Sequence, residues 1–136
     1  MAGDSVTIPE SPSAKVLGWR LLEHDPDRGW VRIAFAARPE FCNPAGFVQG
    51  GFLTAMLDDC MGPAAWLMNR GERFTTTIDM NVSFLAPARP GPLFGEGQVV
   101  KLGGSIAFLE ARLTDAEGQL LARATSSARL VPVPRR

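Results

Sequence analysis

The residues best suited to chemistry are a pair of glycines and a carboxylate that follows the second glycine by seven positions. Gly50 and Gly51 come after a Pro/Gly loop that begins at Asn43, and the apolar segment beyond them contains Asp58. This pattern predicts a loop that closes onto the first turn of a helix, where backbone N–H groups have no intrahelical partner. Such groups bind an anion or a polarised carbonyl oxygen, and glycines let a ligand approach the backbone closely. The stretch therefore predicts a binding site at the start of a helix.

Helical phase divides the segment after the glycines into two faces. At 100° per residue, one face is broad and apolar, comprising Leu53, Met56, Leu57, Cys60, Ala64, Leu67 and Met68. The other is a stripe of small side chains around Asp58, comprising Gly51, Ala55, Gly62 and Ala65. Small residues let a backbone or a ligand come close, so we expect Asp58 to be poorly solvated. The alternative is that Asp58 and Asp59 are both solvated charges on an amphipathic helix, and the pattern supports the two interpretations equally.

Composition limits the classes of function. The chain has 136 residues, of which 46% are hydrophobic, enough for the core of one domain. Its 14 basic and 14 acidic residues balance, which argues against a nucleic acid or an anionic membrane as partner. No apolar run could span a bilayer, and the N-terminus lacks the features of a secretory signal. Cys42 and Cys60 form neither metal-type spacing nor a disulfide framework, so we expect a cytoplasmic protein without a metal.

The pattern along the chain predicts one α+β domain over residues 15–132. Residues 1–14 read as a flexible N-terminal arm and residues 133–136 as a tail. We expect a single long helix and six strands, the helix at about 50–69 and the strands at about 15–23, 30–37, 74–85, 93–102, 105–114 and 119–131. Gly62-Pro63 predicts a kink or short break in the helix. The four late strands, joined by short turns, indicate an antiparallel meander that covers the apolar face of the helix.

The stretch from Asn43 to Asp58 resembles the motif of hotdog-fold acyl-CoA thioesterases of the phenylacetate-degradation type, the 4-hydroxybenzoyl-CoA thioesterase-like family. Their usual pattern is Asn-x-x-Gly-x-x-His-Gly-Gly, with Asp or Glu seven residues later. This chain matches at every position except the histidine, with Asn43, Gly46, Gly50, Gly51 and Asp58. Residues 75–91 also resemble the family's strand after the helix, and the similarity extends from about residue 15 to 132. The resemblance implies the hotdog fold, in which a curved antiparallel sheet wraps one long helix.

The resemblance also implies a role for each matching residue. Asp58 would be the catalytic carboxylate, acting as general base for water or as nucleophile, and the Gly50 N–H would bind the thioester carbonyl oxygen. Asn43 would orient the attacking water or the carbonyl, and Thr77 would position the water or Asp58. One preorganised donor to an oxyanion contributes about 3–4 kcal/mol, and the thiolate leaves without a strong acid. The implied activity is hydrolysis of an acyl-CoA to a free acid and coenzyme A.

Gln49 stands at the position of the family's histidine. Its amide can donate and accept hydrogen bonds but cannot titrate, which excludes a proton shuttle at this position. Two interpretations of Gln49 stay open: it has a catalytic role, or it is a helix-start residue that bonds to the backbone. The replacement also supports a second functional class, a non-hydrolytic protein that binds or senses acyl thioesters. A third class, a hotdog dehydratase or hydratase, pairs a histidine with a carboxylate, and the one histidine here, His24, lies outside the motif.

Helix geometry predicts that the site requires two chains. Gly51 and Asp58 lie about 10 Å apart along one helix, whereas reacting atoms must lie within about 3–3.5 Å. Gly50 and Asn43 of one chain would therefore face Asp58 and Thr77 of a second chain. A two-fold axis would give two equivalent sites per homodimer. The resemblance likewise implies dimers with sites at the interface, paired into homotetramers.

We expect no cofactor, because coenzyme A enters as part of the substrate. Its phosphates need cations or backbone N–H groups. In addition to Gly51, the candidates for binding coenzyme A are Arg89, Lys101, Gly103, Gly104, Ser105 and Arg112. Relatives often carry Arg or Lys at the position of Gly104. For each of these candidates, an ordinary hairpin turn or an exposed charge is favoured over a phosphate contact. Four apolar residues could line an acyl pocket or belong to the core, namely Met56, Met61, Trp66 and Met80.

Overall fold

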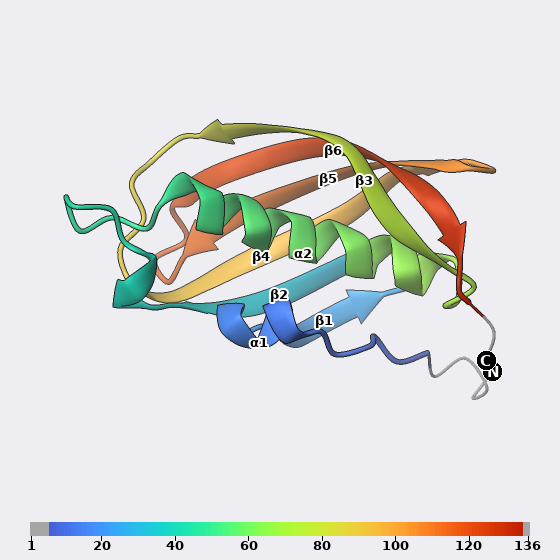
Figure 1. The fold of residues 1–136 in the computed structure, drawn as a ribbon, viewed down its shortest axis with the longest axis horizontal. Helices are drawn as coiled ribbons and strands as arrows, with labels where there is room; N and C mark the ends of the chain where they lie inside the picture. Colours follow the sequence, from blue (N-terminus) through green and yellow to red (C-terminus); the bar gives the residue numbers. More distant parts are fainter. Residues whose placement is uncertain (1–5, 135–136) are drawn as a thin grey trace.

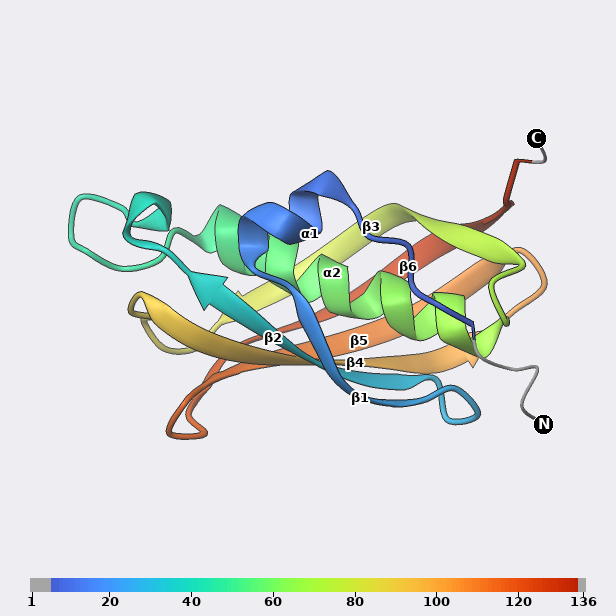
Figure 2. The same cartoon turned by 90° about the horizontal axis from the view of Figure 1, so that it is seen from below.

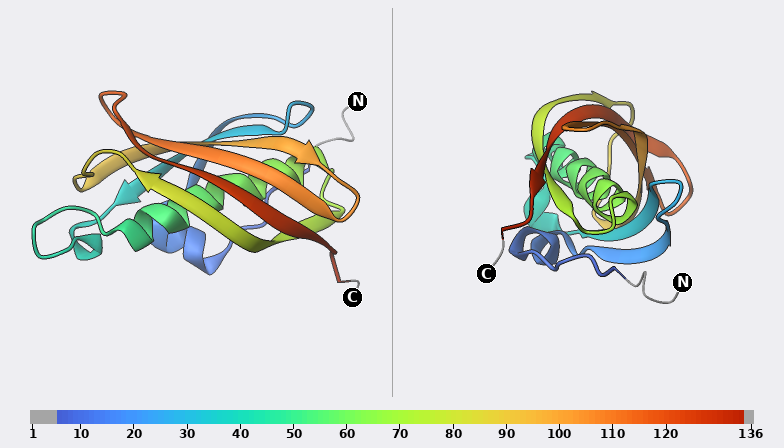
Figure 3. Two further views of the ribbon diagram at one scale, coloured as in Figure 1. Left: turned by 90° about the horizontal axis from the view of Figure 1, so that it is seen from above. Right: turned by 90° about the vertical axis from the view of Figure 1, so that its right-hand side faces the viewer.

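Helix α2 (Gly50–Met68) runs along the inner side of a curved antiparallel sheet, in a computed structural model that describes residues 6–134 (Figure 1). The sheet has six strands, β1 (Arg20–Asp25), β2 (Trp30–Ala37), β3 (Arg73–Phe84), β4 (Gly91–Leu102), β5 (Ile106–Asp115) and β6 (Leu120–Pro132). Seen end-on, the sheet wraps around the helix (Figure 3). The α+β class and the hotdog fold are both confirmed.

The apolar face of α2 packs on the sheet as its phase predicts. Leu53, Met56, Leu57, Cys60, Ala64 and Leu67 are buried, and Met68 is partly buried. The helix lies unusually close to β4, because Gly95 and Gly97 carry no side chain on the inner side of that strand. A Cβ at Gly97 would overlap the carbonyl oxygen of Cys60, and one at Gly95 would overlap the Cys60 thiol. These two glycines therefore set the distance between helix and sheet.

The strand order is β1-β2-β4-β5-β6-β3, which corrects the predicted meander of four strands. Of the four strands after α2, only β4, β5 and β6 follow one another as hairpins, while β3 pairs with β6 at the edge of the sheet. Residues 85–90 connect β3 to β4 by passing the N-terminal end of α2 (Figure 1). The sheet is wrapped around the helix, so β3 and β4 lie on different sides of α2 and cannot form a hairpin.

The beginning of the domain also differs from the prediction. Residues 12–17 form helix α1 (Pro12–Leu17) instead of an arm followed by a strand from residue 15, and β1 begins at Arg20. Ser11 caps α1 by accepting a hydrogen bond from the Ala14 N–H at 3.1 Å. Gly18 ends it with a left-handed backbone, φ 68°. Residues 1–5 of the predicted arm and 135–136 of the predicted tail lie outside the described residues.

The N-terminal segment lies against the side of α2 that the sheet leaves open (Figures 2 and 3). The Trp66 indole N–H donates to the Thr7 carbonyl at 2.9 Å, and Val6 and Ile8 pack on the hydrophobic core. Trp19, which follows α1, donates its indole N–H to the Asp59 carbonyl at 3.0 Å. Helix α2 therefore has apolar cover on the sheet side and on part of the opposite side.

The sequence predicts a kink or a short break at Gly62-Pro63. Helix α2 continues through Pro63, so the break is absent. The proline has no N–H to offer to the carbonyl four residues earlier, which belongs to Asp59. That carbonyl is the one that accepts the Trp19 indole N–H. A hydrogen bond from outside the helix thus replaces the one that proline removes.

No helix within residues 6–134 combines the length and the apolar character that a membrane span requires. The cytoplasmic setting remains a prediction. Both cysteines are free, Cys60 in the core and Cys42 partly exposed.

Candidate active site

The structure brings Asp58 and Thr77 together. Asp58 lies on α2, and Thr77 on β3 donates its hydroxyl to Asp58 Oδ1 at 3.0 Å. A β-bulge at Ile78 interrupts the pairing of β3 with β6 between Thr77 and Asp79. The extra residue changes the alternation of β3, so Thr77 before the bulge and Met80 after it both turn toward the helix side. Thr77 and Asp58 are thus in direct contact, and the positioning role of Thr77 stays a prediction.

In the single chain Asp58 is exposed, so the expectation of a poorly solvated Asp58 is wrong for this protomer. The desolvated carboxylate is its neighbour Asp59, whose Oδ2 is buried without a hydrogen-bond partner in the described part of the chain. Burial, and then the charge of Asp58, raise the pKa of Asp59 to about 6. The helical phase of α2 did not predict the burial of Asp59, because that side of the helix is covered by the N-terminal segment.

The N-terminal end of α2 has the free donors that the glycine pair predicts. Gln49 is the N-cap residue, and its carbonyl accepts from the N–H groups of Phe52 and Leu53 at 3.0 and 3.3 Å. The N–H groups of Gly50 and Gly51 find no acceptor among residues 6–134. They are therefore available to a carbonyl oxygen, as an oxyanion donor must be.

Two further residues of the motif come from the loop and the N-cap that precede these donors. Asn43 uses its Oδ1 to accept from the N–H groups of Ala45 and Phe47 at 3.0 and 3.2 Å, which closes the loop before the helix. Its Nδ2 is the group left for a water or a carbonyl. Gln49 is exposed. It is the helix-start residue that one interpretation expected, but it bonds to the backbone through its own carbonyl and its side chain makes no capping bond. Its amide lies over Gly51, where an added Cβ would be 3.4 Å from Gln49 Oε1.

The glycine pair and the carboxylate remain apart within one chain. Helix α2 is continuous from Gly50 to Met68, so Gly51 and Asp58 are about 10 Å apart along its axis. The structure therefore contains two half-sites: Asn43, Gln49, Gly50 and Gly51 at the end of the helix, and Asp58 with Thr77 near its middle.

The candidates for coenzyme A binding do not form one cluster. The turn from Lys101 to Ser105 lies at the other end of α2 from Gly50 (Figure 1), where the Gly104 carbonyl accepts from Arg73. Arg89 packs over the Phe47 ring, 5.1 Å from its centroid, at the Gly50 end. Arg112 lies on the outer face of the sheet. The turn, Arg89 and Arg112 thus occupy different parts of the molecule, and the phosphate contacts stay a prediction.

Of the four candidates for the acyl pocket, two belong to the core. Met56 and Met61 are 0% and 1% exposed, inside the cluster between helix and sheet. Met80 and Trp66 are partly buried, and the Trp66 indole is held by the N-terminal segment.

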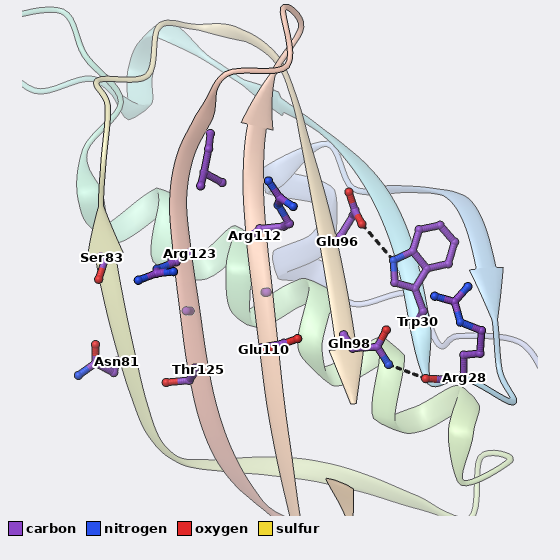
Figure 4. A pocket seen from close by; sticks show the side chains of 13 residues that line it. Arg28, Trp30, Asn81, Ser83, Glu96, Gln98, Glu110, Arg112, Arg123 and Thr125 are labelled. Carbon is purple, nitrogen blue, oxygen red and sulfur yellow. Dashed lines mark hydrogen bonds between the residues drawn. The ribbon is translucent and has the colours of Figure 1, made fainter. Parts of the chain in front are cut away.

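A hollow of about 790 Å³ lies on the outer face of the sheet, away from both half-sites. Figure 4 shows its polar side chains in front of the strands, with α2 behind them. Arg112 and Arg123 are direct partners across β5 and β6, and Glu96 on β4 accepts the Trp30 indole N–H at 3.1 Å. The lining residues Arg112, Arg123 and Glu110 are all exposed. The hollow is therefore part of the solvent-exposed face of an antiparallel sheet and not an enclosed catalytic site.

A family model described as the thioesterase superfamily matches residues 45–122, which is more than half of the chain and contains the glycine pair, Asp58 and Thr77. The chain belongs to the thioesterase superfamily. The predicted hotdog thioesterase family and the enzyme class, thioester hydrolase, are thereby confirmed.

The chain also resembles individual known proteins. Human acyl-coenzyme A thioesterase 13 is 32% identical over 97 residues, 70% of this chain and 69% of the relative. A phenylacetic acid degradation-related protein of Ralstonia eutropha is 31% identical, with a TM-score of 0.85 over 90% of this chain and 92% of the other. The E. coli PaaI protein, from the phenylacetic acid degradation operon, shares the fold, with a TM-score of 0.78 over 89% of this chain and 85% of the other, at 18% identity.

Proposed function

We propose that the protein is an acyl-CoA thioesterase whose active site forms between two copies of the chain. Asp58 acts as general base or nucleophile, and the Gly50 N–H of the second copy is the oxyanion donor. The observation that carries this proposal is the hydrogen bond from Thr77 to Asp58, because it holds a carboxylate on an exposed face without using up its second oxygen. The resemblance to human acyl-coenzyme A thioesterase 13 supports an acyl-CoA as substrate.

The shape of the protomer supports the dimer. Strand β3 is 12 residues long and lies at the edge of the sheet, with only β6 beside it in the described chain. Its exposed side chains include Phe74, Ile78 and Phe84, at 39%, 57% and 54% exposure. A long apolar edge strand tends to pair with another chain. Two copies of β3 joined by a two-fold axis would cover this edge and the exposed Gly51, Ala55 and Asp58 beside it.

The proposed chemistry follows from the two half-sites. The thioester carbonyl oxygen accepts from the Gly50 N–H, which stabilises the negative charge that develops when the carbonyl carbon is attacked. Asp58 either removes a proton from the attacking water or attacks the carbon itself, forming an anhydride that water then opens. The carbon–sulfur bond breaks, and the coenzyme A thiolate takes up the proton released from water. Gln49 and Asn43 contribute hydrogen bonds only, because neither amide titrates.

Thiol release from a panel of acyl-CoAs tests the proposal. We expect Asp58→Asn and Asp58→Ala to lower kcat at least about 100-fold, the lower end of what a general base contributes, while both variants still bind substrate. Glu110→Gln is the matched control, since it removes a carboxylate from the outer face of the sheet and should leave turnover unchanged. Hydrolysis by Asp58→Asn at the parent rate would remove Asp58 from the mechanism.

Gln49 favours one second candidate, a protein that binds acyl thioesters without hydrolysing them. Its exposed amide occupies the place of the family's histidine and has no proton to transfer. Binding of acyl-CoA by the parent chain without any thiol release would select this alternative. A dehydratase has less support, because His24 lies on β1, the opposite edge of the sheet from Thr77 on β3.

A further inference from the structure

Pro63 leaves one carbonyl of α2 without its normal partner, and that carbonyl is next to the candidate catalytic carboxylate. In an uninterrupted helix the N–H of residue 63 would bond to the carbonyl of Asp59, but proline has none. Asp59 follows Asp58 directly, so the weak point of the helix lies within one residue of the carboxylate. Helices bend at such points, because the unpaired carbonyl loosens the hydrogen-bond ladder.

Trp19 supplies the missing bond. Its indole N–H donates to the Asp59 carbonyl at 3.0 Å, from a position 40 residues earlier in the chain. A tryptophan N–H can only donate, so it matches an acceptor that has lost its donor. The bond spans from the junction of α1 and β1 to the middle of α2.

Trp19 is itself held firmly in place. Its backbone N–H donates to the Ala14 carbonyl at 3.0 Å, across the C-terminal end of α1. The preceding Gly18 has a left-handed backbone, and a Cβ there would lie 2.7 Å from the Ala36 Cβ of β2. The cap of α1 is therefore packed against the sheet, and the indole extends from a fixed point.

We propose that Trp19 is a positioning residue for Asp58. Its indole N–H replaces the hydrogen bond that Pro63 cannot make. This bond keeps the middle of α2 in the position at which Asp58 contacts Thr77. The catalytic consequence rests on the proposed function, whereas the effect on the position of Asp58 does not. A displacement of about 1 Å at a reacting group lowers a rate up to about 100-fold, so a loosened helix would reduce turnover.

The decisive test combines two substitutions. One removes the indole donor at residue 19, and the other restores a backbone donor at residue 63. Trp19→Phe keeps an aromatic ring but loses the donor, and we expect kcat to fall about 10-fold with KM changed less than about twofold. Pro63→Ala returns an N–H to residue 63. The double variant Trp19→Phe/Pro63→Ala should therefore have a kcat within about twofold of Pro63→Ala alone.

Trp30→Phe is the matched control. It also removes an indole donor, in this case the one that bonds to Glu96 on the outer face of the sheet. Trp30→Phe should leave kcat unchanged, both in the parent and in the Pro63→Ala variant. A Trp19→Phe enzyme with parental kcat would overturn the proposal, as would a double variant that stays as slow as Trp19→Phe.

A second measurement separates this inference from the proposed function. The 13C resonance of the Asp58 carboxyl should shift in Trp19→Phe and return in the double variant. If the parent hydrolyses no acyl-CoA, the proposed function fails, and this resonance still decides the role of Trp19. An Asp58 resonance that Trp19→Phe leaves unmoved would overturn the inference whatever the activity.

Discussion

Thr77 Oγ1 lies 3.0 Å from Asp58 Oδ1, so the edge strand β3 and the central helix α2 meet at the candidate catalytic carboxylate. The hydroxyl occupies one carboxylate oxygen and fixes the rotamer of Asp58, while the other oxygen remains open to water. Neither element could orient the carboxylate alone, because the helix supplies the acid and the strand supplies the donor.

Thr77→Val should lower kcat about 10-fold, because valine keeps the shape of threonine and removes the hydroxyl that orients Asp58. Thr77→Ser is the matched control and should stay within about threefold of the parent. Steady-state kinetics on one acyl-CoA substrate measure both. Equal rates for the valine and serine variants would show that the hydroxyl has no part in turnover.

Gly97→Ala should destabilise the fold by about 3 kcal/mol or more, because the new methyl group overlaps the Cys60 carbonyl oxygen and forces α2 away from β4. Thermal unfolding should show a clear decrease in Tm. Gly104→Ala is the control, since an added Cβ there has no neighbour within 4 Å. A Tm for Gly97→Ala equal to that of Gly104→Ala would refute the close packing of helix and strand.

In the proposed dimer, Ile78→Lys should separate the two chains and abolish turnover, because it puts a charge into the apolar edge of β3. Val100→Lys makes the same chemical change at a side chain of similar exposure, 61% against 57%, away from that edge. Light scattering reports the mass of each variant. A dimeric Ile78→Lys enzyme, or a fully active monomer, would contradict the shared site.

The raised pKa of Asp59 predicts that the free energy of unfolding depends on pH. Burial raises its pKa to about 6 in the folded chain, above the 3.8 of a solvated aspartate, so the fold favours the protonated form. This stabilising contribution is complete below pH 4 and is lost as the pH rises through 6. After discounting for partial exposure, we expect the parent to lose about 1–2 kcal/mol between pH 4 and pH 7.5 that Asp59→Asn does not lose.

Denaturant unfolding at a series of pH values measures this difference. Glu110→Gln, on the outer face, should keep the parental pH dependence. Parallel stability curves for the parent and Asp59→Asn would mean that the Asp59 carboxyl is well solvated in the protein.

Local patterns were sufficient for most elements of the fold. The predicted helix at about 50–69 is found at Gly50–Met68, and the predicted strand at 30–37 is Trp30–Ala37. In both cases apolar periodicity and glycine punctuation lie within the element itself. The Asn43, Gly50, Gly51 and Asp58 spacing likewise indicated the family, because a loop, a helix start and a carboxylate occur on one continuous stretch.

One error is local, and the others concern places where distant segments meet. Residues 15–17, expected to begin a strand, belong to helix α1, which starts from a Ser11 cap and Pro12 within a polar segment. The four-strand meander failed because short connections do not reveal that β3 pairs with β6 around the helix. The expected break at Pro63 is absent, and the hydrogen bond that the Asp59 carbonyl accepts there comes from Trp19, which lies outside the helix.

The sequence by itself determined which residues form the helix, which strands surround it and which spaced residues could act on a thioester, because each of these depends on neighbours along the chain. Only the tertiary structure decided that Asp58 is exposed beside Thr77 while Asp59 is desolvated, and that the glycine pair stays a separate half-site. Solvation and hydrogen-bond partners depend on the segments that fold over a residue, and for α2 these come from β3 and from the N-terminal segment, far away in the chain.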